Sequence, residues 1–295
     1  MIPDPSSWIH ETISTNGLNF HMVSQGEGPV VLMLHGFPEN WYSWRHQLSA
    51  LAQHGYKAVA MDMRGYNLTD RPTRVSDYRM PLLVADVEGL ISALGCEKVH
   101  LVGHDWGGVV AWTFGARHPE RLLSLTILNS PHPKAFAWHL KHNFRQLRRS
   151  WYMFFFQIPI LPELLIRLAA DQTFVRTFRG WAIHKEMFSD DVIDFFKKPM
   201  LQPGALTAGI NYYRAMLRNV KTLNEAQQFP KISVPTQVIW GENDRALGKE
   251  LCDGLEDYFE NHFELHFIPN CSHWVQQEEP DKVNELLVDF FKRVA

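Results

Sequence analysis

The chain is poor in cysteine and carries little excess charge of either sign. Only three cysteines occur among 295 residues, and no two of them form a CxxC pair. That usage is not typical of a disulfide-stapled secreted domain, and it predicts buried thiols in a reducing compartment. The net charge of −3 supplies no long-range attraction for nucleic acid or for an anionic membrane.

Long uninterrupted apolar runs are also missing. The most apolar stretch, WYMFFFQIPILPELLIRL at residues 151–168, is broken by Gln157, Pro159, Pro162, Glu163 and Arg167. A membrane-spanning helix needs about 20 nearly continuous apolar residues, so we expect the wall of an apolar cavity here, with a sticky surface as the alternative. The first residues, MIPDPSSWIHET, lack a basic segment followed by an apolar core, so we expect no signal peptide and a cytoplasmic location.

What the sequence does contain is a regular alternation of strand and helix patterns. A hairpin is predicted around Asn16-Gly17. Apolar strand patterns follow at 29–36, 56–65, 98–105 and 122–130, and helical patterns separate them at 41–54, 80–95 and 106–120. After a gap, strands are predicted at 235–244 and 263–273, with a helix between them and a final helix to the end. Strands separated by helices indicate a mostly parallel sheet flanked by helices.

The alternation stops between the sixth and seventh strand patterns. Residues 133–229 look helical and aromatic, with no convincing strand. We therefore predict an α/β core made of residues 1–132 and 230–295, with residues 133–229 inserted as a helical cap, or lid. Because it shares no sheet, the lid is expected to lie over the carboxyl ends of the strands.

Four polar motifs follow predicted strands directly, where open parallel sheets place their ligands. They are HGFPE (35–39), GHDWGG (103–108), GENDRAL (241–247) and CSHW (271–274). Asp105, Asp244 and His273 then read nucleophile, acid and histidine, which is the chain order of an α/β-hydrolase triad. Each residue alone could be a helix cap or a loop histidine, but their spacing and the glycines beside Asp105 favour catalysis.

These four motifs, in this order, resemble the epoxide hydrolase family of the α/β-hydrolase fold. The resemblance runs from about Asn19 to the C-terminus. It implies that Asp105, already ionised at neutral pH, attacks a saturated carbon and forms an alkyl-enzyme ester. His273, oriented by Asp244, then activates the water that hydrolyses this ester. The backbone N–H groups of Phe37 and Trp106 are the expected oxyanion hole.

The same triad serves haloalkane and fluoroacetate dehalogenases, so the leaving group must be decided elsewhere. An opening epoxide becomes a basic alkoxide and needs a proton, which a tyrosine can donate. Tyr152 and Tyr213 lie in contexts similar to those of the lid tyrosines of epoxide hydrolases. The resemblance favours Tyr213 over its neighbour Tyr212. Haloalkane dehalogenases more often have Asn where Phe37 stands, and fluoroacetate enzymes usually have Arg in place of Trp106.

The expected substrate is a lipophilic epoxide, with water as the second reactant and the vicinal diol as product. We also expect His35, Pro38, Phe155 and Trp274 to contact the substrate. No feature indicates a cofactor, a metal or nucleic acid, and the chain is expected to be a monomer or a homodimer. A receptor that binds ligand without turnover is a less favoured alternative. The basic residues between Lys134 and Arg149 predict a solvated helix face, or less favourably an attraction for acidic substrates or an anionic surface.

Overall fold

The computed structural model describes residues 7–218 and 228–294. Residues 1–6, which begin the stretch inspected for a signal peptide, and residues 219–227, near the end of the expected lid, lie outside the described part. Eight strands form one sheet in the order β1-β2-β4-β3-β5-β6-β7-β8. Strands β3 to β8 run parallel to one another, whereas β1 and β2 pair antiparallel to their neighbours. The predicted mostly parallel α/β sheet is therefore confirmed.

The strands coincide closely with the predicted patterns. They are β1 Ile9–Thr15, β2 Leu18–Gln25, β3 Val30–Leu34, β4 Lys57–Met61, β5 Val99–His104, β6 Leu122–Leu128, β7 Thr236–Gly241 and β8 Phe263–Ile268. The hairpin between β1 and β2 turns at Asn16 and Gly17, both with positive φ, as the Asn-Gly pair predicts. Strands β3 and β5 are buried along their whole length, because helices cover both faces of a parallel sheet.

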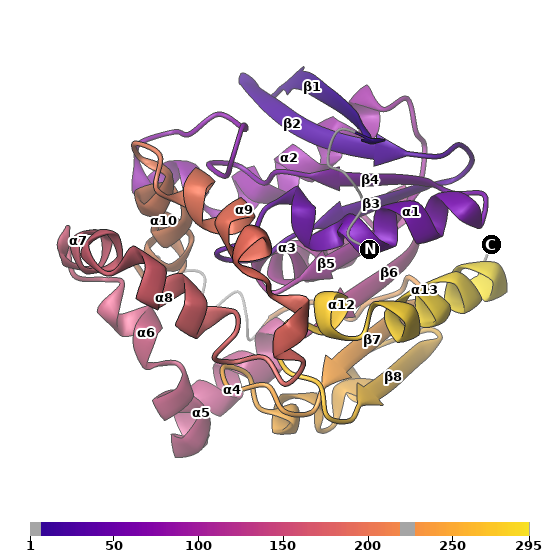
Figure 1. Cartoon of the computed structure of the whole chain (residues 1–295). Helices are drawn as coiled ribbons and strands as arrows, with labels where there is room; N and C mark the ends of the chain where they lie inside the picture. Colours follow the sequence, from indigo (N-terminus) through magenta and orange to yellow (C-terminus); the bar gives the residue numbers. More distant parts are fainter. Residues whose placement is uncertain (1–6, 219–227, 295) are drawn as a thin grey trace.

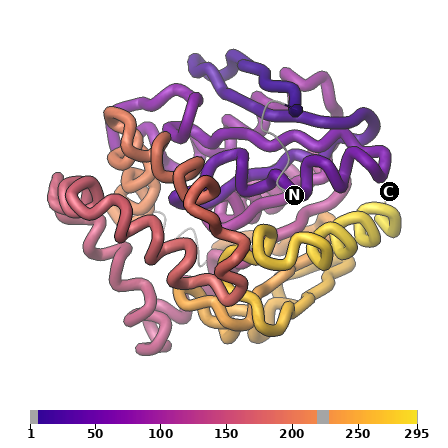
Figure 2. Tube along the Cα trace, in the orientation of Figure 1, coloured from indigo at the N-terminus to yellow at the C-terminus, as the bar shows by residue number. Residues whose placement is uncertain are grey.

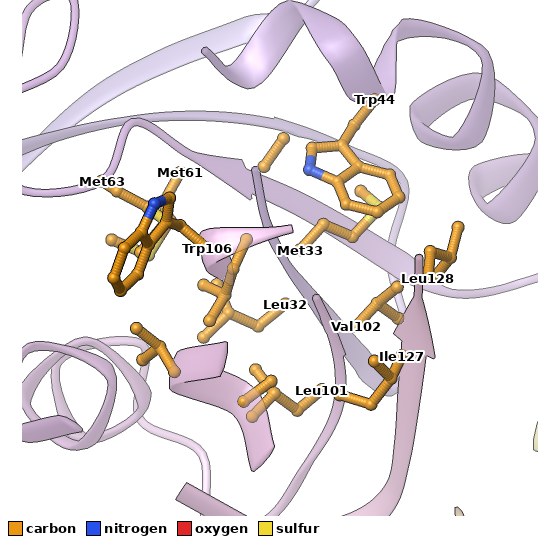
Figure 3. Close-up of a cluster of buried hydrophobic side chains, with 14 of the residues drawn as sticks. Leu32, Met33, Trp44, Met61, Met63, Leu101, Val102, Trp106, Ile127 and Leu128 are labelled. Atoms are coloured by element: carbon orange, nitrogen blue, oxygen red, sulfur yellow. The ribbon is translucent and has the colours of Figure 1, made fainter. Parts of the chain in front are cut away.

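Helices pack on the two faces of this sheet (Figure 1). α2 (Met80–Ala93) and α3 (Trp106–Arg117) lie against one face, and α1 (Arg45–Gln53) and α13 (Pro280–Val294) against the other. The short α12 (Val275–Glu278) precedes α13. Figure 3 shows part of the resulting core, where buried side chains of the central strands meet Trp44 and Trp106. Within the described residues, no helix is both long and apolar enough to cross a membrane.

Between β6 and β7 the described chain is helical, as predicted. The helices are α4 Pro133–His142, α5 Phe144–Arg149, α6 Trp151–Phe155, α7 Leu161–Leu168, α8 Ala170–Thr177, α9 Asp190–Met200 and α10 Ala205–Arg218. They gather at one end of the sheet, on the left of Figures 1 and 2. Contacts such as Tyr42 stacked on Phe195 of α9, with ring centroids 4.1 Å apart, join them to the core.

Two expectations need correction. The helix predicted between β7 and β8 is replaced by two single-turn 3-10 helices, Lys249–Cys252 and Leu255–Tyr258. Gly254, whose φ of 70° is left-handed, separates them and prevents a continuous α-helix. Of the three free cysteines, Cys252 and Cys271 are buried as predicted, whereas Cys96 is only half-buried.

Candidate active site

Asp105 stands at the sharp turn that joins β5 to α3. Its φ of 48° and ψ of −117° are unusual for a residue with a side chain, and such strain is common at functional sites. The turn is tight enough that a Cβ on Gly107 would collide with the carbonyl of Leu34. Glycine at this position therefore lets α3 begin against β3, which pushes the Asp105 carboxylate forward of the strand ends.

His273 links the two carboxylates of the predicted triad. Its Nδ1 lies 2.7 Å from Oδ2 of Asp244, and its Nε2 lies 3.7 Å from Oδ2 of Asp105. The loops after β7 and β8 bring Asp244 and His273 to the same edge of the sheet as Asp105. The structure thus brings together three residues that are widely separated in the sequence.

Asp244 is held in place by donors on every side. The backbone N–H groups of Ala246 and Leu247 donate to its Oδ1 at 2.7 and 2.9 Å. The side-chain amide of Asn129 donates to Oδ2 at 2.8 Å, while its own oxygen accepts from the N–H of Gly241. Asn129 therefore fixes the acid of the triad from the end of β6. No sequence motif pointed to this role of Asn129.

The second oxygen of Asp105 already occupies the expected oxyanion hole. The backbone N–H of Phe37 donates to Oδ1 at 2.8 Å, and the backbone N–H of Trp106 also bonds the carboxylate. The Phe37-Pro38 peptide bond is cis. Oδ1 thus points to backbone N–H donors and Oδ2 points to His273. The two oxygens have different surroundings and can therefore have different chemical roles.

The protonation of the triad follows from burial and charge. Burial raises the pKa of Asp105, although the charge of His273 opposes that effect. For Asp244, burial is outweighed by the charge and hydrogen bond of His273, which lower its pKa. Burial alone would lower the pKa of His273, but the charge and hydrogen bond of Asp244 and the charge of Asp105 raise it to about 9. At neutral pH His273 is therefore mostly an imidazolium, held between Asp244 and Asp105.

Tyr152 and Tyr213 face Asp105 across a cavity of 270 Å³ between the sheet and the helices α4 to α10. Their rings, on α6 and α10, are 5.7 Å apart, and the indole N–H of Trp106 donates to the Tyr213 oxygen. Burial and the nearby charge of Asp105 raise the pKa of both tyrosines above the ordinary value. Both hydroxyls are therefore protonated at neutral pH.

Tyr212 points away from this cavity. Its hydroxyl donates to the backbone carbonyl of Arg64 at 2.8 Å, and its ring packs against Tyr66 and Tyr78. Adjacent helical residues point about 100° apart, so only one of the pair can reach Asp105. Tyr213 lines the cavity beside Asp105, and Tyr212 does not.

The cavity wall is mostly apolar and comes from both the core and the lid helices. Beside the residues named above it includes Val109, Phe136, Leu140, Met153, Met216, Phe229 and Leu247. Sequence patterns did not single these residues out, because an apolar side chain facing a cavity looks the same as one facing the core. The expected apolar pocket is present within the described part of the chain.

The four predicted substrate contacts lie elsewhere. His35 is fully buried, with Nδ1 on the carbonyl of Gly36 and Nε2 accepting from the N–H of Met63. Trp274 is buried behind His273 and donates to the carbonyl of Thr177. Phe155 packs on Trp151 and Phe156, and Pro38 follows the oxyanion turn. None of the four is among the described residues that line the cavity.

A buried pair of side chains, Glu39 and His104, lies beside the triad. Glu39 Oε2 lies 2.7 Å from Nδ1 of His104, and Nε2 of His104 lies 2.9 Å from the backbone carbonyl of His273. Burial tends to raise the pKa of Glu39, but the charge and hydrogen bond of His104 lower it overall. Glu39 ends the HGFPE motif and His104 lies in GHDWGG, but neither motif predicts this contact between them. Within the described residues, no cluster of three or more His, Cys, Asp or Glu side chains could hold a metal ion.

Comparison with known proteins agrees with this geometry. The family model for the alpha/beta hydrolase fold matches residues 29–280. Epoxide hydrolase 3 of Xenopus tropicalis is 40% identical over 94% of this chain and 76% of its own. Epoxide hydrolase 4 of Mus musculus is 36% identical over 98% of this chain and 81% of its own.

A solved structure shows similarity to an epoxide hydrolase as well. The crystal structure of a Bacillus megaterium epoxide hydrolase in complex with an inhibitor is similar with a TM-score of 0.83 and 32% identity, covering 96% of this chain and all of that chain. Both the sequence relatives and this structure match the core and the helices between β6 and β7 together. The chain therefore belongs to the epoxide hydrolase family of the α/β-hydrolase fold.

Proposed function

We propose that this protein converts lipophilic epoxides and water to vicinal diols through a covalent ester on Asp105. The observation that carries the proposal is the placement of Tyr152 and Tyr213 opposite Asp105 across one apolar cavity. A nucleophile on one wall and two proton donors on the other suit a ring whose carbon is attacked while its oxygen is protonated. The helices of residues 133–229 would act as the lid that carries those donors.

In the first step, Oδ2 of Asp105 forms a bond to an epoxide carbon, and the carbon–oxygen bond of the ring breaks. Its electron pair goes to the ring oxygen, which takes a proton from Tyr152 or Tyr213. Oδ2 is the attacking atom in this proposal because Oδ1 is already bound by the N–H of Phe37. Burial disfavours a free phenolate, so the tyrosine gives up its proton only as the more basic alkoxide forms.

In the second step, His273 takes a proton from a water that attacks the ester carbonyl of Asp105. The former Oδ1 becomes an oxyanion between the N–H groups of Phe37 and Trp106. Collapse of this intermediate releases the diol, whose new hydroxyl takes the proton from His273. The proton left on the Asp105 carboxyl passes to the tyrosinate formed in the first step, so that the carboxylate and the tyrosine are both restored. His273 must be neutral here, and alkylation assists because the neutral ester removes one of the charges that raise its pKa.

The site supplies its own nucleophile, base and acid, so we propose that it works without a metal or an organic cofactor. We further propose a cytoplasmic enzyme, monomeric or homodimeric, with a role in epoxide detoxification. The low cysteine content and three free thiols support a reducing compartment.

A single turnover in ¹⁸O-labelled water tests the mechanism. With enzyme in excess over styrene oxide, the first diol should carry unlabelled oxygen from Asp105, and a second turnover should release label. Label in the first diol would rule out the covalent ester. Release of halide from a haloalkane without diol from styrene oxide would favour a dehalogenase, and binding without turnover would favour a receptor.

A further inference from the structure

Exposed apolar side chains are concentrated on one stretch of the lid. Ten of the sixteen large apolar side chains that are exposed in the described chain fall between residues 138 and 168. We call them the lid strip: Trp138, Phe144, Trp151, Phe154, Ile158, Ile160, Leu161, Leu164, Leu165 and Leu168. Such clustering is unlike the scattered exposed apolar residues of an ordinary surface and indicates an interaction site.

The strip runs along consecutive helices at the margin of the molecule. α7, α6 and α5 follow the left and lower margin in Figures 1 and 2, and α4 leads from α5 back toward the core. On α7, Leu161, Leu164, Leu165 and Leu168 have the three- and four-residue spacing that puts side chains on one helical face. These four side chains are 39–75% exposed, so this face of α7 lacks a partner among the described residues.

The exposed charges within the sequence interval of the strip have one sign. Lys141, Arg145, Arg148 and Arg167 are exposed between residues 138 and 168. The single acid in that interval, Glu163, is paired with Arg214 and largely covered. The whole chain carries a net charge of −3, so the acidic residues are concentrated elsewhere. A partner that fits this edge therefore offers an apolar layer and, next to it, negatively charged groups.

The helices that carry the strip also form the cavity wall. On α4, Phe136 and Leu140 line the cavity, while Trp138 is exposed outside. On α6, Tyr152 and Met153 line the cavity, while Trp151 and Phe154 are exposed. One helix thickness separates the strip from the substrate cavity at both places.

We propose that the lid strip docks on the surface of an anionic lipid bilayer. The leucine face of α7 and the exposed aromatic residues would enter the boundary between headgroups and acyl chains, as in interfacial amphipathic helices. Lys141, Arg145 and Arg148 would contact anionic headgroups, and tryptophan is favoured at this depth. A second copy of the chain suits the strip less well, since a two-fold contact would place these cations against one another. Docking would bring the cavity next to the phase in which lipophilic epoxides dissolve.

Flotation with vesicles tests the proposal without any activity measurement. The protein should bind vesicles of phosphatidylcholine with phosphatidylglycerol, and bind vesicles of phosphatidylcholine alone much more weakly. Each cation near an anionic membrane strengthens binding about fivefold, so Arg145→Glu with Arg148→Glu should weaken it by at least about 25-fold. Leu164→Ser with Leu168→Ser should also abolish flotation.

Leu68→Ser is the matched control, because Leu68 is 68% exposed but lies on the core; it should float like the wild type. All variants should hydrolyse a water-soluble epoxide at the wild-type rate, which shows that they fold. Equal binding of wild type and Leu164→Ser/Leu168→Ser would overturn the proposal. So would a dimer in sedimentation velocity that this double substitution dissociates, if the wild type does not float.

Discussion

At the scale of single residues, two neighbouring tyrosines of α10 have different environments. Tyr213 reaches the cavity beside Asp105, whereas the hydroxyl of Tyr212 donates a hydrogen bond to the carbonyl of Arg64.

Tyr213→Phe should lower kcat/KM for epoxides by a factor of about 10²–10⁴, the usual contribution of a general acid, with little change in thermal stability. Tyr212→Phe should leave kcat/KM near the wild-type value but destabilise the fold by about 1–3 kcal/mol, because a buried carbonyl loses its donor. Steady-state kinetics and thermal melts of both variants check this; the reverse pattern would assign the acid to Tyr212.

The pKa of His273 offers a second prediction at this scale. It is raised to about 9 in part by the charge of Asp105. Asp105→Asn removes that negative charge, which stabilised the imidazolium, so the pKa of His273 should fall below 9. NMR titration of the imidazole protons measures it directly.

Asp171→Asn is the control for that titration, since Asp171 pairs with Lys197 on the lid surface. It should leave the pKa of His273 unchanged. The same reasoning predicts that hydrolysis of the alkyl-enzyme accelerates with rising pH through a midpoint below 9, because His273 must lose its proton to act as a base. A pKa that stays at the wild-type value in Asp105→Asn would contradict the charge coupling.

The sequence indicated candidate site residues only where a strand end and its flanking glycines marked the position. Asp105, Asp244 and His273 follow strands in glycine-bearing motifs, and the fold gathers strand ends. Asn129 also follows a strand, but its contribution depends on reaching Asp244 across 115 residues of sequence. His35 and Trp274 stand beside catalytic positions yet point away from the cavity, and side-chain direction in a loop cannot be deduced from spacing alone.

At the scale of elements, α6 and α10 must be held together for both tyrosines to face Asp105. Arg214 of α10 donates to the carbonyls of Phe156 and Ile158 at the end of α6. It also forms a largely buried ion pair with Glu163 of α7, with Nη1 2.7 Å from Oε1. Together with Gln157, whose amide donates to the carbonyl of Tyr213, this side chain ties the end of α6 to α10.

Arg214→Ala should therefore lower kcat by about tenfold or more, because misplacing a donor by even about 1 Å is costly. It should also destabilise the protein by about 2–4 kcal/mol, since Glu163 is left with a largely buried, unpaired charge. Arg214→Ala with Glu163→Gln should recover part of the stability but not the rate. Kinetics and denaturant unfolding separate the two effects; full recovery of kcat in the double variant would argue against a positioning role.

Element boundaries show where sequence patterns succeed and fail. Strands buried on both faces and the core helices α2 and α3 were predicted within a few positions, because long periodic patterns are strong signals. The helices of the lid were predicted only as one helical region, without individual bounds. The helix predicted between β7 and β8 was wrong, because the left-handed Gly254 divides a segment that otherwise has helical composition. The division at residues 132/133 and 229/230 stays a prediction of where core and lid separate.

At the scale of the whole molecule, the cavity is the place where core and lid share a ligand. Its wall combines core residues such as Asp105 and Val109 with lid residues such as Tyr152 and Met216. A bound product must therefore stabilise both parts together.

A lipophilic diol at about 100 times its Kd should add about 2.7 kcal/mol to the free energy of unfolding and raise the Tm by roughly 5 °C. Calorimetry should show a single cooperative transition. Ethylene glycol at the same concentration cannot fill the apolar wall and should have no effect. Two separate transitions, of which the diol moves only one, would mean that the lid unfolds independently and that its tyrosines are held by local contacts alone.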